Sequence, residues 1–178
     1  MSLIKIPISR GMLDYASEAS KVTAVRRTIA SPFDTLAGLL GELVFAEYIY
    51  NDFTQHNLYN TKGKADFFNE IEIKTSAFPF RENLNLLVRS DYAKKRKPLY
   101  YIQIILDIPS RNSKKIDIDT NGIICGYATS KDIDRAPLRD FGSKFGGYGG
   151  YECHFIPINR LKPIREVKKF IDKNFINS

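Results

Sequence analysis

The sequence predicts a single α/β (α+β) domain in which a mixed central sheet is flanked by helices. Three observations predict it: a capped helix at 32–50, an apolar strand at 100–108, and a basic amphipathic helix at 164–175. A helix, several strands and a final helix, in that order, are typical of helices packed on a sheet. At 178 residues the chain suits one domain, and 43% hydrophobic with 26% charged residues indicates a folded globular protein.

The second helix carries the clearest local signals. Residues 12–30 are helix-compatible, and Ser31 then offers an N-cap, followed by a proline at the first helical position and an acid at Asp34. We expect this helix to end near Asn51. On a helical wheel Glu47 falls within the apolar stripe, whereas Glu42 falls on a side with small residues, which would let the helix lie close to a sheet.

Two strands, at 58–68 and 70–76, are expected next, with a very tight turn around Asn69. The second strand alternates, so its isoleucines face one side while Glu72 and Lys74 face the other. The strand at 100–108 is apolar on both faces and is therefore expected to be central. The remaining predictions are a strand or loop end at 84–88, an exposed basic stretch at 91–97, a strand at 123–128, a helix from Ser130, a glycine-rich loop at 141–150 and a strand at 151–156.

Composition restricts the function. Lys plus Arg number 27 against 20 Asp plus Glu, a net charge of +7, which favours a polyanionic partner. The sequence has no apolar run long enough for a membrane span, and its N-terminus lacks a signal-peptide pattern. Two cysteines, Cys125 and Cys153, fit a reducing cytoplasm and exclude a cysteine zinc cluster. With only His56 and His154 besides, zinc is disfavoured.

One group of charged residues suggests chemistry. Glu42 lies on the second helix, Asp66 near the end of one expected strand, and Glu72 and Lys74 on the polar face of the next. Carboxylates on adjacent strands repel one another, and a divalent cation removes that repulsion. Magnesium binds one or two carboxylates together with waters and a substrate phosphate. A nearby lysine can hold a water or stabilise charge on phosphorus, so the set fits metal-assisted phosphodiester hydrolysis.

These residues resemble the PD-(D/E)xK nuclease superfamily, which has a restriction endonuclease-like fold that Holliday-junction resolvases share. The matching segments lie within 31–106 and are Gly41-Glu42, Ala65-Asp66 and Glu72-Ile73-Lys74. The resemblance implies Mg²⁺ (or Mn²⁺) bound by Asp66, Glu72 and the backbone carbonyl of Ile73. It also implies that Lys74 positions the attacking water and that Glu42 completes the metal site.

The sequence departs from the family pattern in two ways. Only five residues separate Asp66 from Glu72, so the expected hairpin is short and Glu70 is a rival ligand. Ala65 replaces the proline of the family name. Glu47 is an alternative to Glu42 as the helix acid, and Gln103 on the next strand is a further candidate.

Basic residues indicate where DNA would bind. The run Lys94, Lys95, Arg96 and Lys97 follows the candidate site in sequence and is the first choice for phosphate contact, together with Lys144 in the glycine-rich loop. That loop could be a substrate-contacting flap or a plain turn. A basic C-terminal region, strand plus helix at about 151–176, completes the domain.

The expected protein is a metal-dependent endonuclease of duplex or branched DNA, cytoplasmic and nucleoid-associated when bound, and a homodimer or higher homo-oligomer. A junction resolvase or a homing-type nuclease of the same fold is one alternative. A non-catalytic DNA-binding module is another, and phosphate contacts alone leave RNA open as the nucleic acid.

Overall fold

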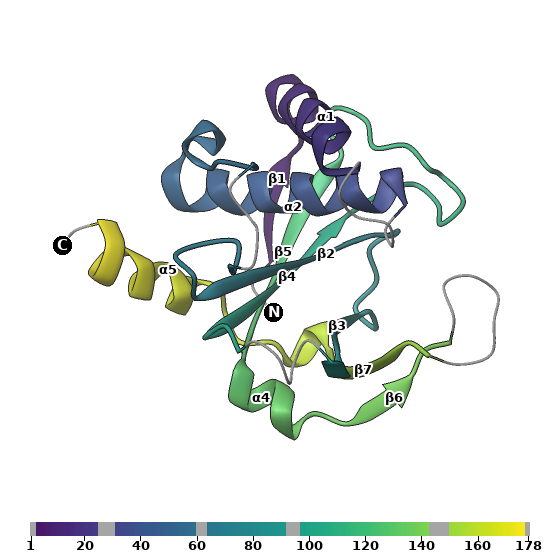
Figure 1. Ribbon diagram of the computed structural model, residues 1–178, viewed down its shortest axis with the longest axis vertical. Coiled ribbons are helices and arrows are strands. Elements are labelled where there is room, and N and C mark those ends of the chain that lie inside the picture. Colours follow the sequence, from purple (N-terminus) through teal and green to yellow (C-terminus); the bar gives the residue numbers. More distant parts are fainter. Residues whose placement is uncertain (1–2, 25–30, 60–63, 92–96, 143–149, 177–178) are drawn as a thin grey trace.

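The computed structural model describes residues 3–24, 31–59, 64–91, 97–142 and 150–176 (Figure 1). These ranges form a mixed α+β structure with two sheets and four α-helices, as the sequence predicts at the level of fold class. None of the helices in these ranges is long and apolar enough to cross a membrane. The elements in chain order are β1 (Ile4–Pro7), α1 (Arg10–Ala24), α2 (Pro32–Tyr50), η1 (Phe53–Gln55), β2 (Ile71–Ala77), β3 (Asn85–Arg89), β4 (Tyr100–Leu106), β5 (Asn121–Thr129), α4 (Ser130–Arg135), β6 (Leu138–Asp140), β7 (Glu152–Pro157), η2 (Ile158–Arg160), α5 (Arg165–Ile171) and η3 (Asp172–Ile176).

The main sheet has the strand order β1-β5-β4-β2 and is mixed, because β2 runs parallel to β4 while the other neighbours are antiparallel. The expected central strand is confirmed, since β4 lies between β5 and β2 and is buried along nearly its whole length. β2 is an edge strand, so its outer side has no strand partner within the sheet.

A second sheet, with the order β3-β7-β6, packs on the other side of the main sheet from α1 and α2 (Figure 1). Leu86 and Val88 of β3 contact Tyr101 and Ala128 of the main sheet in a small apolar core. The sequence predicts the strands β3 and β7 but gives no sign that they form a separate sheet. The short strand β6 and the N-terminal strand β1 were not predicted.

Helix α2 begins and ends where its sequence predicts. Ser31 caps it, since the Oγ atom accepts a hydrogen bond from the Asp34 amide at 3.1 Å. Its C-cap Asn51 adopts a left-handed conformation with φ of 55°. The helix lies very close to the sheet: a Cβ atom at Gly41 would be 1.9 Å from Thr75 Oγ1 of β2. A glycine at this position is therefore what allows α2 to approach the strand that carries the candidate lysine.

Three predictions of secondary structure need correction or limits. The predicted strand at 58–68 is wrong: its described residues form turns and one bridge, Phe67 to Ile71, because Leu58 and Phe67 are buried anchors of a loop rather than members of an alternating face. The first helix ends at Ala24, and residues 25–30 lie outside the described ranges. Most of the glycine-rich loop, 143–149, also lies outside them.

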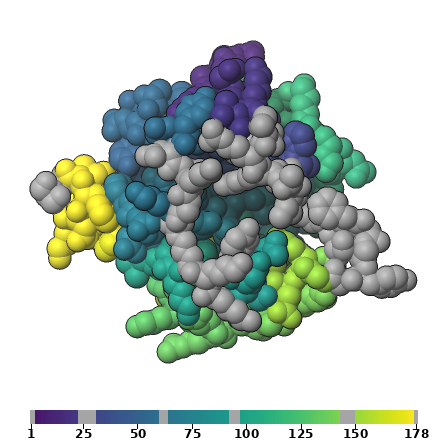
Figure 2. All heavy atoms as spheres, in the orientation of Figure 1, coloured from purple at the N-terminus to yellow at the C-terminus, as the bar shows by residue number. Residues whose placement is uncertain are grey.

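The C-terminal helix α5 is shorter than the sequence predicts and continues as a π-helical segment over Asp172–Ile176. This segment lies at the edge of the molecule (Figure 2). The ring of Phe175 stacks on Phe68 with centroids 4.3 Å apart. The C-terminus thereby covers the turn that precedes β2.

Candidate functional site

The acid on helix α2 has a histidine partner. The carboxylate Oε2 of Glu42 lies 2.8 Å from Nε2 of His56, and the two side chains are only 12% and 9% exposed. The imidazole stacks on the ring of Phe67, with centroids 4.1 Å apart. Burial lowers the pKa of His56 to about 4, so the ring is neutral at pH 7 and donates its Nε2–H to Glu42. Glu42 is held in place by this contact.

Asp66 lies in a tight turn rather than on a strand. Phe68 and Asn69 have φ values of 52° and 59°, and the Glu70 amide donates to the Phe67 carbonyl at 3.0 Å, as in a type I′ turn. The predicted tight turn at Asn69 is therefore confirmed. The Oδ2 atom of Asp66 accepts a hydrogen bond from the Ile73 amide at 2.7 Å. The carboxylate thus occupies the outer edge of β2.

The peptide groups of Ile73 point away from β4. The Tyr100 amide donates to the Glu70 carbonyl across the parallel pair, and peptide groups along a strand alternate in direction. The peptide groups of residues 70, 72 and 74 therefore form hydrogen bonds toward β4, while the peptide groups of Ile73 face the open edge. Its amide meets Asp66, and its carbonyl faces the same edge, where the resemblance implies a metal ligand.

Glu72 and Lys74 lie on the face of β2 that points away from helix α2. Ile71 and Ile73 are buried under that helix, whereas the two charged side chains are about one-quarter exposed. The Nζ atom of Lys74 lies 2.8 Å from Oε1 of Glu72. This alternation is the one the sequence predicts, and it places an ammonium group beside a carboxylate at the border between core and solvent.

The four predicted charged groups come together around the edge of β2. Burial raises the pKa of Asp66 well above its ordinary value, and the charges of Glu42 and Glu72 raise it further. The hydrogen bond from Ile73 and the charge of Lys74 act in the opposite direction. Asp66 therefore lies between the helix acid on one face and the Glu72–Lys74 pair on the other. We call Glu42, Asp66, Glu72 and Lys74 the cluster.

The two alternative acids, Glu47 and Glu70, have different surroundings. Glu47 accepts a hydrogen bond from the Phe53 amide at 2.9 Å, so it fixes the start of the loop that carries His56 and is not part of the cluster. Glu70 acts on the hydroxyl of Tyr100, whose pKa is raised mainly by burial and then by Glu166 and Glu70. Glu47 is therefore engaged in the loop that follows α2, whereas Glu70 stays an alternative to Asp66 and Glu72 as a ligand.

Gln103 of β4 lies beside Lys74 in the parallel register and is 1% exposed. Its Nε2 atom donates to the Ile104 carbonyl at 2.9 Å. The side chain shares the sheet face of Lys74 and can act as a buried polar neighbour of the ammonium group. Its amide nitrogen is used within its own strand.

Only one of the predicted DNA-binding basic residues lies in the described ranges. Lys97 is exposed and forms an ion pair with Asp134 of α4 at 2.6 Å. An exposed pair of this kind contributes at most about 1 kcal/mol to stability. Lys94, Lys95, Arg96 and Lys144 lie outside the described residues.

The chemistry of the donor atoms fits magnesium. Carboxylate and carbonyl oxygens are the ligands that this hard cation prefers. Within the part of the chain that the structure describes, no three His, Cys, Asp or Glu side chains are grouped so that they alone could hold a metal ion. Magnesium commonly keeps several waters and uses one or two protein carboxylates, so the donor types of Asp66, Glu72 and the Ile73 carbonyl suit this cation. A cation there would also lessen the repulsion that raises the pKa of Asp66.

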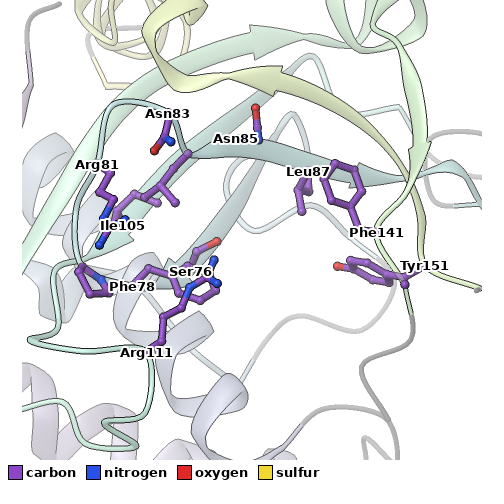
Figure 3. A pocket seen from close by; sticks show the side chains of 13 residues that line it. Ser76, Phe78, Arg81, Asn83, Asn85, Leu87, Ile105, Arg111, Phe141 and Tyr151 are labelled. Carbon is purple, nitrogen blue, oxygen red and sulfur yellow. The ribbon is translucent and has the colours of Figure 1, made fainter. Parts of the chain in front are cut away.

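Sequence reasoning missed two features of this region. It gave no sign that His56 contacts Glu42, because this contact depends on a loop whose path no periodicity reveals. It also gave no sign of a cavity of about 580 Å³ beside the cluster, between the two sheets (Figure 3). The residues that line this cavity come from five separate segments of the chain.

Comparison of the chain with protein-family models, curated proteins and solved structures gave no match.

Proposed function

We propose that this protein is a divalent-metal-dependent endonuclease that hydrolyses DNA phosphodiesters, with a core of the PD-(D/E)xK, restriction endonuclease-like type. The observation that carries the proposal is the convergence of Glu42, Asp66, Glu72 and Lys74 at the open edge of β2. Three carboxylates with one ammonium group, partly buried, are costly to keep unless a cation or a phosphate uses them.

The residues would divide the work as follows. Asp66 and Glu72, with the carbonyl of Ile73, would hold the Mg²⁺ ion, which supplies Lewis-acid activation of the phosphate and of water. Lys74 donates hydrogen bonds to the attacking water and to a non-bridging phosphate oxygen, so it offsets charge that grows on phosphorus. One P–O bond forms with the water oxygen, the opposite ester P–O bond breaks, and the leaving oxygen takes up a proton.

His56 and Glu42 support this arrangement without touching the substrate. The neutral imidazole keeps Glu42 oriented at 2.8 Å, and Glu42 in turn acts on Asp66. The contact with His56 thereby holds the negative charge of Glu42 in place, and a bound cation would offset its repulsion of Asp66.

The test is cleavage of supercoiled plasmid with Mg²⁺, with EDTA, and with Lys74→Ala. We expect nicking or linearisation that needs both the metal and Lys74. Metal-dependent cutting that survives Lys74→Ala would show that the site is misplaced or that the activity is a contaminant. Tight DNA binding without cutting of plasmid, linear duplex or junctions would instead favour a non-catalytic DNA-binding module.

A homodimer is part of the proposal, because two cuts in a duplex need two active sites. Light scattering of the free protein and of its complex with duplex DNA tests it. A monomer in both conditions would leave only single-strand nicking for one copy.

A further inference from the structure

The cavity of about 580 Å³ lies between the main sheet and the second sheet and is open to solvent (Figure 3). Ser76 of β2 and Ile105 of β4 form its wall on the main sheet, and Asn85 and Leu87 of β3 form part of the opposite wall. Its volume falls within the range of ordinary ligand sites. We call it the inter-sheet cleft.

The side chains that line the inter-sheet cleft are of the types that contact nucleotides in proteins. Figure 3 shows Phe141 and Tyr151 on one side and Phe78 on the other, so aromatic rings border the space between them. The guanidinium of Arg111 lies 5.0 Å from the centre of the Phe78 ring. Arginine planes and aromatic rings are the surfaces on which unstacked bases lie in proteins that bind single strands.

Polar groups complete the set. Arg81 and Arg111 are exposed cations at the cleft, suited to phosphate oxygens, and Asn83 and Asn85 offer amide donors and acceptors for a base edge. No acidic side chain lines this cleft among the described residues. Its charge is therefore complementary to that of a nucleic acid strand.

The cleft adjoins the cluster along one strand. Ser76 lies on the same face of β2 as Glu72 and Lys74, two residues beyond the lysine, which corresponds to about 6.6 Å along a strand. The second sheet also comes near the lysine, since the charge of Lys74 acts on the thiol of Cys153, two residues from Tyr151. A strand with its scissile phosphate at Lys74 would place its next nucleotide at the mouth of the cleft.

We propose that the inter-sheet cleft binds one unpaired nucleotide next to the scissile phosphate, so that the substrate is DNA that is single-stranded at the point of cleavage. The proposal deepens the proposed nuclease function and rests on it, because only a nuclease has a scissile phosphate. In a duplex the base faces are stacked on their neighbours and only their edges are exposed. Aromatic side chains on both sides of a cleft gain contact only with a base that has left the stack.

The experiment measures binding separately from cleavage. A fluorescent single-stranded DNA octamer and a hairpin duplex of the same charge are titrated in EDTA by anisotropy. We expect the octamer to bind at least about tenfold more tightly than the hairpin. Tyr151→Ala and Phe78→Leu should each weaken octamer binding about tenfold and leave hairpin binding unchanged, because each removes one stacking surface. Phe78→Leu retains an apolar side chain, so its thermal unfolding should stay close to that of the wild type.

Arg111→Ala and Arg160→Ala are a matched pair, since each removes one exposed arginine, and Arg160 lines a separate cavity that shares no lining residue with this cleft. Arg111→Ala should weaken octamer binding more than it weakens hairpin binding. Arg160→Ala should affect the binding of the two DNAs equally. Equal affinity for the two DNAs, or octamer binding that both aromatic substitutions leave unchanged, would overturn the proposal. Octamer binding that depends on Phe78 and Tyr151 while no DNA is ever cut would retain the cleft and reject the nuclease.

Discussion

The two faces of the main sheet differ in how they are covered. Helix α2 lies so close to one face that Gly41 contacts Thr75 and Gly122 contacts Val44, and that face is apolar and buried. The second sheet covers only part of the other face and leaves a cleft of about 580 Å³. Glu72, Lys74 and Ser76 project on that side, where each is half-buried.

The alternating strand β2 therefore serves two purposes. Odd-numbered residues of β2 anchor the strand beneath α2, and even-numbered residues carry charge into a space that a substrate can enter. Because the packed face fixes the backbone, the charged face is positioned without packing of its own. Changes to one face should therefore leave the other largely intact.

The largest expected effect is on catalysis. Lys74→Met should lower the rate of DNA cleavage by about 10²–10³-fold, the loss typical for a charge-stabilising donor. Its ion pair with Glu72 is only about one-quarter exposed, and its loss leaves the nearby carboxylates without a cation, so the substitution should also destabilise the protein by about 1–3 kcal/mol. Single-turnover cleavage and thermal unfolding check the two values. A larger loss of stability would show that the two faces are coupled.

Next in size is the effect of magnesium on stability. Burial, Glu42 and Glu72 disfavour the ionised form of Asp66. The pKa of this carboxyl is therefore higher in the folded protein than in the unfolded chain, and stability falls as the pH rises above the ordinary pKa of an aspartate. Saturating Mg²⁺ at 100 times its Kd should stabilise the protein by about 2.7 kcal/mol, or about 5–10 °C in Tm. Asp66→Asn should be more stable than the wild type in EDTA and should respond far less to Mg²⁺. Equal Mg²⁺ responses of the two proteins would contradict the assignment.

The packed face is tested by two glycines in one helix. Gly41→Ala should destabilise the protein by about 1–3 kcal/mol, because its Cβ would lie 1.9 Å from Thr75 Oγ1. A Cβ at Gly38 meets nothing within 4 Å, so Gly38→Ala should stabilise by about 0.5–1 kcal/mol through helix propensity. Urea unfolding of the pair measures both signs. Similar changes for both would mean that the close approach at Gly41 relaxes at no cost.

The smallest expected effect is a pH dependence. Burial holds the pKa of His56 at about 4, below the ordinary 6.5, so the unfolded chain takes up this proton first and stability falls as pH drops from 6.5 toward 4. His56→Gln keeps an N–H donor for Glu42 and removes the titration. Its loss of unfolding free energy between pH 7.5 and 5.5 should be smaller than that of the wild type by about 1 kcal/mol. Parallel curves for the two proteins would show that His56 does not titrate in this way.

Local signals predicted the elements that position the cluster. The serine cap and proline fixed the start of α2, and strict alternation identified β2 and the face of Lys74. Strand β4 was recognised as central because both of its faces are apolar. The tight turn followed from Asn69, whose residue type tolerates a positive φ.

The remaining features depend on contacts between distant segments. His56 meets Glu42 through a loop that Glu47 and Phe67 hold in place, and none of these contacts has a sequence period. The strand predicted at 58–68 failed because buried Leu58 and Phe67 imitate a strand in composition. The second sheet joins β3 to β7, which lie more than sixty residues apart, so its cleft could not be foreseen.

The bond from the Ile73 amide to Asp66 also affects how the protein behaves toward other chains. An open edge strand offers unpaired amides that invite pairing with another strand and, in time, aggregation. The carboxylate of Asp66 accepts the hydrogen bond of the Ile73 amide, and the negative charges around Asp66 repel an approaching acidic chain. The same residue that would bind a cation thus guards the edge of the sheet, and any self-association by strand addition would have to use another edge, such as β1.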